Sequence, residues 1–140
     1  MFEKGFINKL NLLSENNFFD NLEIKRGIER EALRVDTVGK ISQKSHPKKL
    51  GSALCNPHIT TDFAEALIEL VTPKFNDVND LYLFLEQIHA FARKNLKNEI
   101  FWNTSMPCKF NNEGEIRLAE YGASNLGKLK NIYRRGLKQR

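Results

Sequence analysis

Acidic side chains at two-residue spacing are the first candidates for chemistry in this sequence. Glu29 and Glu31 are separated by Arg30. In a β-strand, alternate residues project from the same face, so these two carboxylates are expected about 6.5 Å apart along one face. Carboxylate oxygens are ligands that Mg²⁺ prefers in proteins. The pair is therefore a candidate for part of a divalent-metal site, although most Glu-x-Glu pairs on exposed strands are only solvated.

A second acidic segment, residues 62–72, fits either a helix or a strand. As a helix, it gathers its apolar residues on one side. As a strand, it places Glu65 and Glu69 on one face and Ile68 and Leu70 on the other. Intrinsic propensity slightly favours the helix. Only the strand would show acids on one side that could converge with Glu29 and Glu31, so the residues alone leave the question open.

Other chemical signatures are missing from the sequence. There is no Walker A motif and no Gly-x-Gly-x-x-Gly after a predicted strand. If the protein handles ATP, it must hold the phosphates with metal ions and basic side chains. Cys55 and Cys108 have neither a metal-ligand spacing nor a disulfide framework, so both are expected to be reduced thiols.

Length and composition are those of one ordinary soluble domain. The chain has 140 residues, of which 41% are hydrophobic and 28% are charged. No apolar run approaches the roughly 20 residues that span a bilayer. The first residues contain no uninterrupted apolar core of a secretory signal. A cytoplasmic protein with no membrane partner is the expectation.

The net charge of +5 is concentrated at the C-terminal end. No acidic residue follows Glu120, whereas six basic residues do: Lys128, Lys130, Arg134, Arg135, Lys138 and Arg140. Such a block could contact the phosphates of nucleic acid or of a nucleotide, or be only the solvated face of a helix. It leaves a small basic nucleic-acid-binding domain as an alternative function. No nucleic-acid-binding motif supports that alternative, and no specific nucleic acid is expected as a partner.

Periodicity predicts the elements around these residues. Apolar residues recur at helical spacing at the start of the chain and again after Asp77, and either Asn76 or Asp77 can cap the second of these helices. The predicted order is a helix over 2–13, a strand within 22–36, a loop over 42–57, a helix over 78–96, irregular chain over 102–108, a turn at Gly114 and a helix over 124–137.

A longer set of motifs resembles the proteobacterial glutamate–cysteine ligases, also called γ-glutamylcysteine synthetases. Residues 26–35 read Arg-Gly-Ile-Glu-Arg-Glu-Ala-Leu-Arg-Val, and that family has Arg-Gly-Leu-Glu-Arg-Glu-x-Leu-Arg-Val. The resemblance continues, in the order of the family and close to its spacing, at residues 46–47, 50–54, 59–67, 105–108, 121–125 and 133–138. Any one of these motifs could arise by chance, but the full set in register is specific.

The resemblance implies an enzyme, a fold and a cofactor. In that family, ATP phosphorylates the side-chain carboxylate of L-glutamate, and the amine of L-cysteine attacks the acyl phosphate to give γ-glutamylcysteine, the first step of glutathione biosynthesis. The implied fold is α+β, part of an antiparallel-sheet funnel similar to the catalytic domain of glutamine synthetase, with flanking helices. In this fold, acids on the inner face of the funnel hold Mg²⁺. The resemblance therefore implies that residues 65–71, which were open between helix and strand, form a strand.

Individual residues take roles only through this resemblance. Three acids are implied as metal ligands: Glu29, Glu31 and Glu69. Three residues are implied to form part of the pocket for the incoming cysteine: Phe63, Tyr133 and Leu137. Arg134 is implied to face the charge of the substrate or the nucleotide. No catalytic residue is assigned.

Members of the family are several times longer than this chain. Residues 1–140 are therefore expected to be the incomplete N-terminal part of a single catalytic domain, without the histidine, further acids and arginines of the complete site. A truncated or inactive fragment, or a decayed remnant without function, is the matching expectation. Open sheet edges and uncovered apolar side chains are expected at Ile24, Ile28, Ile68 and Leu70.

Overall fold

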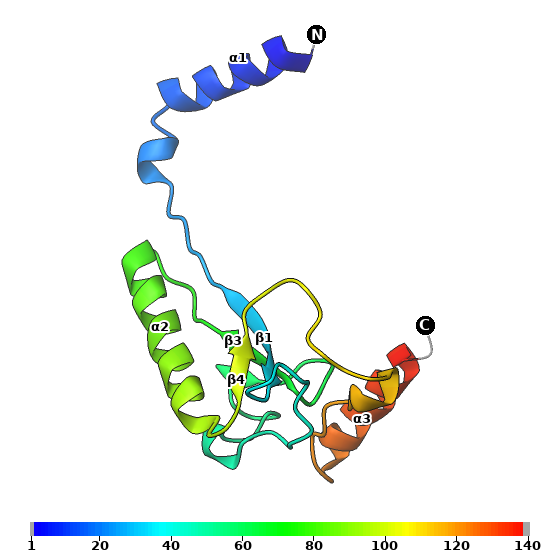
Figure 1. Ribbon diagram of the computed structural model, residues 1–140. Coiled ribbons are helices and arrows are strands. Elements are labelled where there is room, and N and C mark those ends of the chain that lie inside the picture. Colours follow the sequence, from blue (N-terminus) through cyan, green and yellow to red (C-terminus); the bar gives the residue numbers. More distant parts are fainter. Residues whose placement is uncertain (1, 139–140) are drawn as a thin grey trace.

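A four-stranded antiparallel sheet in the order β2-β3-β1-β4 lies at the centre of the structure, a computed structural model (Figure 1). It describes residues 2–138, apart from the side chains of residues 2, 21, 134, 137 and 138. The strands are β1 (Glu29–Val35), β2 (Ile59–Thr60), β3 (Leu67–Val71) and β4 (Ile100–Trp102). The α-helices are α1 (Phe2–Glu15), α2 (Val78–Asn95) and α3 (Asn125–Lys138). Single 3₁₀ turns occur at Phe19–Asn21, Lys48–Leu50 and Glu113–Glu115. The predicted α+β class with an antiparallel sheet is confirmed.

Strand β1 is shorter than the segment 22–36 in which it was predicted. Beyond Glu29 the ladder with β3 becomes irregular, because Thr72 N–H still donates to the Ile28 carbonyl (3.0 Å) but the Ile28 N–H donates to the Thr72 hydroxyl (2.9 Å) instead of to its carbonyl. The register then shifts by one residue, and the two segments pair again where Arg26 and Phe75 exchange backbone hydrogen bonds of 2.9 and 2.8 Å.

Helix α2 covers one face of the sheet. Of the two predicted cap residues, Asn76 and Asp77, it is Asp77 that caps the first turn, by accepting hydrogen bonds from the N–H groups of Asn79 (2.6 Å) and Asp80 (3.3 Å). Its apolar stripe packs on the side chains that β1, β3 and β4 direct to this face, in a core that includes Ala32, Ile68, Leu70, Ala92, Leu96 and Phe101. This packing fixes the strands, so the opposite face of the sheet is presented on a rigid support.

The expectation of uncovered apolar side chains is right for two residues and wrong for two. Ile24 and Ile28 are 47% and 40% exposed. Ile68 and Leu70 are fully buried, because α2 covers their face of β3. The helix that follows β3 therefore covers this part of the sheet within the chain itself.

Strand β4 was not predicted. It pairs with the end of β1, so that Leu33 lies opposite Trp102 and Val35 opposite Ile100. Phe101 projects into the core under α2. The irregular chain predicted from residue 102 begins only after this strand, where the Trp102 indole N–H donates a 2.6 Å hydrogen bond to the carbonyl of Met106.

A buried ion pair joins the end of β1 to the start of β4. The Arg34 side chain is fully buried, and its Nη1 lies 3.0 Å from Glu99 Oε1. Its Nη2 donates to the carbonyls of Lys44 (2.8 Å) and Glu65 (2.7 Å). Burial lowers the pKa of Arg34, while the Glu99 carboxylate raises it. The guanidinium therefore ties three separate segments together.

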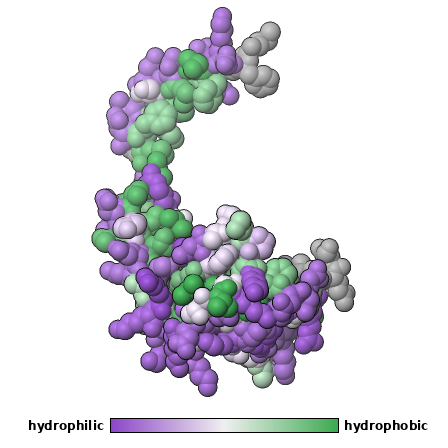
Figure 2. Space-filling view, in the orientation of Figure 1, coloured by the Kyte–Doolittle hydropathy of each residue, from purple (hydrophilic) through white to green (hydrophobic). Residues whose placement is uncertain are grey.

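The two terminal helices have different surroundings. Helix α1 stands clear of the sheet at the end of an extended segment (Figure 1). Hydrophobic side chains are exposed along both the helix and this segment (Figure 2). Phe6, Ile7 and Leu12 are 62%, 52% and 59% exposed. Helix α3 approaches the backbone of Tyr121 closely at Gly127. A side chain in place of this glycine would clash with the Tyr121 carbonyl. None of the helices between residues 2 and 138 is both long and apolar enough to cross a membrane.

Candidate functional site

Three acids share the face of the sheet opposite α2. Glu31 lies directly opposite Glu69 across the β1–β3 ladder, and Glu29 lies opposite Val71. Both glutamates of β1 are exposed, and Glu69 is half-buried. The strand implied for residues 65–71 is confirmed from Leu67 to Val71. The structure therefore brings Glu29, Glu31 and Glu69 onto one face.

The opposition of Glu31 and Glu69 has an electrostatic cost. Directly paired residues on neighbouring antiparallel strands have Cα atoms about 4.5–5.5 Å apart, and like charges at such positions destabilise the sheet. A cation between the two carboxylates would offset this cost. The donors fit Mg²⁺ in type, because all three are carboxylate oxygens. Within residues 2–138, no group of three His, Cys, Asp or Glu side chains is gathered closely enough to form a metal site by itself.

A cavity of 280 Å³ lies beside Glu31. Glu31, Leu33 and Leu67 form its floor on the sheet, and its wall is formed by Trp102 and residues 104–107. The hydrogen bond from Trp102 to Met106 shapes this wall. Sequence reasoning gave these wall residues no role. The resemblance at residues 105–108 was the signal that could have placed them at the site.

Glu65 is not part of this face, contrary to the strand interpretation of residues 62–72. Its side chain is only 2% exposed, and it accepts hydrogen bonds from the backbone N–H groups of His46 and Glu120, both at 2.7 Å. The reason is a turn closed by the 2.9 Å bond from Leu67 N–H to the Ala64 carbonyl, after which β3 begins. Glu65 is a structural carboxylate that joins two loops.

The residues implied for the cysteine pocket come from two elements. Phe63 is half-buried before β3, and its carbonyl accepts a 3.0 Å hydrogen bond from Ala119. Tyr133 projects from α3 with 65% of its surface exposed, and among the described side chains no ring contact joins it to Phe63. The side chains of Arg134 and Leu137 lie outside the described residues. The pocket therefore stays a prediction.

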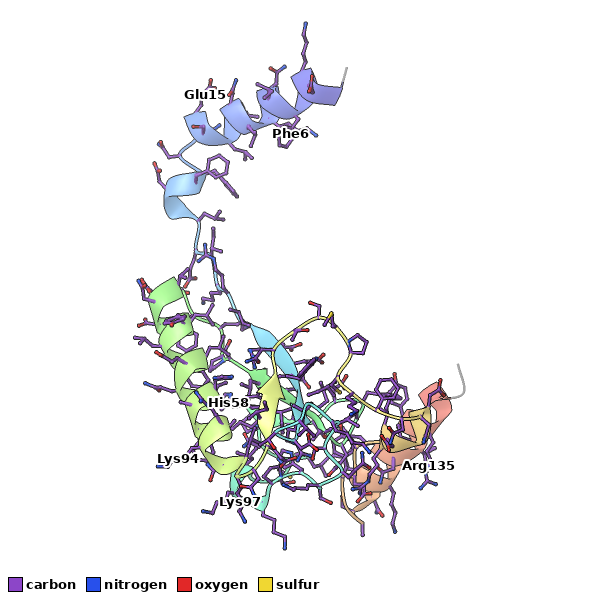
Figure 3. The ribbon with its side chains drawn as sticks, viewed as in Figure 1. Phe6, Glu15, His58, Lys94, Lys97 and Arg135 are labelled. Carbon is purple, nitrogen blue, oxygen red and sulfur yellow. The ribbon has the colours of Figure 1, made fainter. Side chains whose placement is uncertain are left out.

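A second hollow, of 560 Å³, lies between residues 117–123 and α3. Arg117, Glu120, Asn131 and Arg135 are among its lining residues, and Figure 3 shows Arg135 on α3. Arg117 forms a 2.9 Å ion pair with Glu120 and donates to the Gln43 carbonyl at 2.6 Å. The hollow thus borders the helix that carries Tyr133 and has basic side chains on both of its sides.

Comparison with known proteins identifies the family of this chain. The family model described as "Glutamate-cysteine ligase" matches residues 10–140. The chain belongs to the glutamate–cysteine ligase family. It is 53% identical over 119 residues to the glutamate–cysteine ligase of Hahella chejuensis, covering 84% of this chain and 23% of that protein. It is 47% identical over 133 residues to the one from Janthinobacterium sp., covering 94% and 25%.

Solved structures agree with this assignment. The crystal structure of the Francisella tularensis glutamate–cysteine ligase in complex with AMP matches with a TM-score of 0.79 and 43% identity, over 83% of this chain and 23% of that one. A bifunctional glutathione synthetase from Pasteurella multocida matches with a TM-score of 0.66 and 30% identity, over 78% and 14%. The chain spans about a quarter of the length of the curated relatives it matches. These matches give no support to a small nucleic-acid-binding domain.

Proposed function

We propose that this chain forms the part of a glutamate–cysteine ligase that contributes acidic ligands for Mg²⁺. The observation that carries the proposal is the direct opposition of Glu31 and Glu69, with Glu29 on the same open face and a cavity beside Glu31. The activity is ATP-dependent ligation of the side-chain carboxylate of L-glutamate to the amine of L-cysteine. It gives γ-glutamylcysteine through an acyl phosphate.

The geometry of the sheet supports this role for the three acids. Since the opposite face of β1 and β3 is packed under α2, the backbone that carries the acids is held in place. Glu31 borders the cavity, and Glu29 lies about 6.5 Å further along the same strand. Bound Mg²⁺ would supply positive charge that neutralises phosphate oxygens during phosphoryl transfer. The rigid face supplies carboxylates to hold that charge in a fixed place.

The amino-acid substrates are proposed to bind on the α3 side. Phe63, Tyr133 and Leu137 would surround the cysteine side chain, and Arg134 would face a negative charge of the substrate or the nucleotide. The basic hollow that borders α3 supports this placement, because both substrates carry carboxylates. Residues 1–140 are proposed to be part of a single catalytic domain. The complete enzyme would work in the cytoplasm with ATP, L-glutamate and L-cysteine, without a membrane or a specific nucleic acid.

A chimera tests the proposal. This chain would replace the matching segment of the Francisella tularensis ligase, to which it is 43% identical. We expect the chimera to form γ-glutamylcysteine, and Glu29→Gln, Glu31→Gln or Glu69→Gln to lower its turnover about 100-fold at limiting Mg²⁺. The exposed Glu86 on α2 provides a matched control, and Glu86→Gln should leave the rate unchanged. An active chimera that keeps its rate in all three variants would remove these acids from the metal site.

A further inference from the structure

A basic cavity of 300 Å³ lies at the C-terminal end of α2, away from the acidic face. Residues 44, 45 and 47–49 form one wall, and residues 95–97 and 99 form the other. Four lysines line it: Lys44, Lys48, Lys49 and Lys97. Figure 3 shows Lys97 and the neighbouring Lys94 at this end of the helix. The hydroxyl of Ser45 and the amide of Asn95 add polar groups to the lining.

The positive charge of this cavity is not balanced within it. Glu99 is the acid among the described lining residues, and its carboxylate is already paired with the buried guanidinium of Arg34 at 3.0 Å. None of the four lysines forms a salt bridge with a described side chain. Lys94, in the last turn of α2, offsets the partial negative charge that the helix terminus brings to this region. The cavity therefore favours an anion.

The two walls are held together before any ligand arrives. Arg34 donates to the Lys44 carbonyl at 2.8 Å, and the Lys44 N–H donates to the Ser42 hydroxyl at 3.1 Å. That hydroxyl donates in turn to Glu99 in the other wall. The loop ends on Leu50, which is 1% exposed. A ligand would therefore bind without a large entropic cost of ordering the loop.

Lys97 occupies a position that is usually taken by glycine. It follows Leu96, the C-cap of α2, and has a φ of 56° in the left-handed region. A side chain there is less favourable than glycine. The sequence nevertheless has a lysine at this point, where it adds a charge to the cavity lining. A positive charge beside the helix C-terminus offsets part of this cost, and the same lysine extends the cluster of positive charge that lines the cavity.

We propose that this cavity binds a small, multiply charged anion of the phosphate class. Its volume falls at the lower end of ligand pockets, which suits a phosphate or pyrophosphate group. Arg34, which donates to the Lys44 carbonyl in the cavity wall, projects from one face of β1, and Glu31 projects from the other. The cavity is therefore separate from the acids proposed to hold Mg²⁺. The inference goes beyond the proposed function and does not depend on it.

Titration of the ¹⁵N-labelled chain with inorganic phosphate, pyrophosphate and glucose 6-phosphate, at constant ionic strength, tests the site. We expect saturable shifts of the backbone amides of residues 44–49 and of Lys97, with pyrophosphate binding most tightly. Lys48→Gln and Lys97→Gly should each weaken binding about tenfold. Lys97→Gly should also raise the melting temperature, so its loss of affinity cannot come from unfolding. Lys74→Gln, at an exposed lysine outside the cavity, is the matched control and should bind as the parent does.

The arms of this experiment separate the sources of the phosphate group. Equal affinity for phosphate and glucose 6-phosphate indicates a free anion, and tighter binding of the ester indicates a phosphorylated metabolite; both outcomes support the site. Glu31→Gln should change neither, which keeps this test distinct from that of the metal site. The proposal is overturned by linear, unsaturated shifts, or by equal losses in Lys74→Gln and Lys48→Gln. Phosphate-induced shifts centred on α3 instead of on residues 44–49 and Lys97 would also overturn it.

Discussion

The Arg34–Glu99 ion pair offers a quantitative test of the packing around β1. In Glu99→Ala, the fully buried guanidinium of Arg34 loses its counter-charge. Breaking a buried ion pair by removing one partner costs about 3–5 kcal/mol. Arg34 keeps two carbonyl acceptors, on Lys44 and Glu65. The loss should therefore fall near the lower end of that range, at about 3 kcal/mol.

Urea unfolding at 25 °C, followed by far-UV circular dichroism, measures this loss. The free energy of unfolding of a domain is about 5–15 kcal/mol, so the substitution removes a fifth of it or more. With a denaturant slope of about 1–3 kcal/mol per molar urea, the midpoint should fall by about 1–3 M.

The exposed pair Arg117–Glu120 is the matched control. Its separation, 2.9 Å, is nearly that of the buried pair, but its side chains are 34% and 62% exposed. Glu120→Ala should therefore cost less than about 1 kcal/mol. The double substitution Arg34→Met with Glu99→Leu should recover only part of the stability lost in Glu99→Ala, because it removes both buried charges but leaves the carbonyls of Lys44 and Glu65 without a donor. The reasoning is refuted if Glu99→Ala costs no more than Glu120→Ala.

Three further predictions follow from the fold and the site. Burial, with a smaller effect of Arg34, lowers the pKa of His46 from 6.5 to about 4, so folding disfavours its protonation. The resulting stabilisation is complete above pH 6.5 and is lost as the pH falls towards 4. His46→Gln should flatten the pH dependence of urea midpoints over that range. Asp77→Ala should lower the free energy of unfolding by about 1 kcal/mol in the same assay, because two N–H groups of α2 lose their acceptor, whereas Asp77→Asn should cost little. The 140-residue chain by itself should form no γ-glutamylcysteine from L-glutamate, L-cysteine and MgATP, measured by mass spectrometry; an ATP-dependent product that disappears in Glu29→Gln would contradict this.

Local patterns in the sequence were sufficient for the helices. The apolar stripe of α2 and its cap at Asp77 are set by residues a few positions apart, so periodicity and capping predict them directly. Strand β3 was different, since Ala66, Leu67 and Glu69 also favour a helix. Pairing with β1 determines its conformation, and that pairing is a contact between distant segments. The motif resemblance supplied what local propensity could not.

The parts of the site that sequence reasoning missed depend on contacts that are distant in sequence. Strand β4 has three residues and forms against the end of β1, so no periodicity could reveal it. The turn after Ala64 removes Glu65 from the face of Glu69, although strict alternation from Glu69 would include it. By contrast, the shared face of Glu29, Glu31 and Glu69 follows from alternation once both segments are strands.

Paramagnetic broadening by Mn²⁺, used as a substitute for Mg²⁺, tests the central claim most directly. In spectra of the ¹⁵N-labelled chain, low Mn²⁺ concentrations should first broaden the amides of residues 29–32 and 68–70. Glu31→Gln should abolish this local effect, and Glu86→Gln on the opposite side of the sheet should leave it unchanged. The account is contradicted if Glu31→Gln broadens as the parent does, or if the broadening centres instead on the exposed acids Glu113 and Glu120.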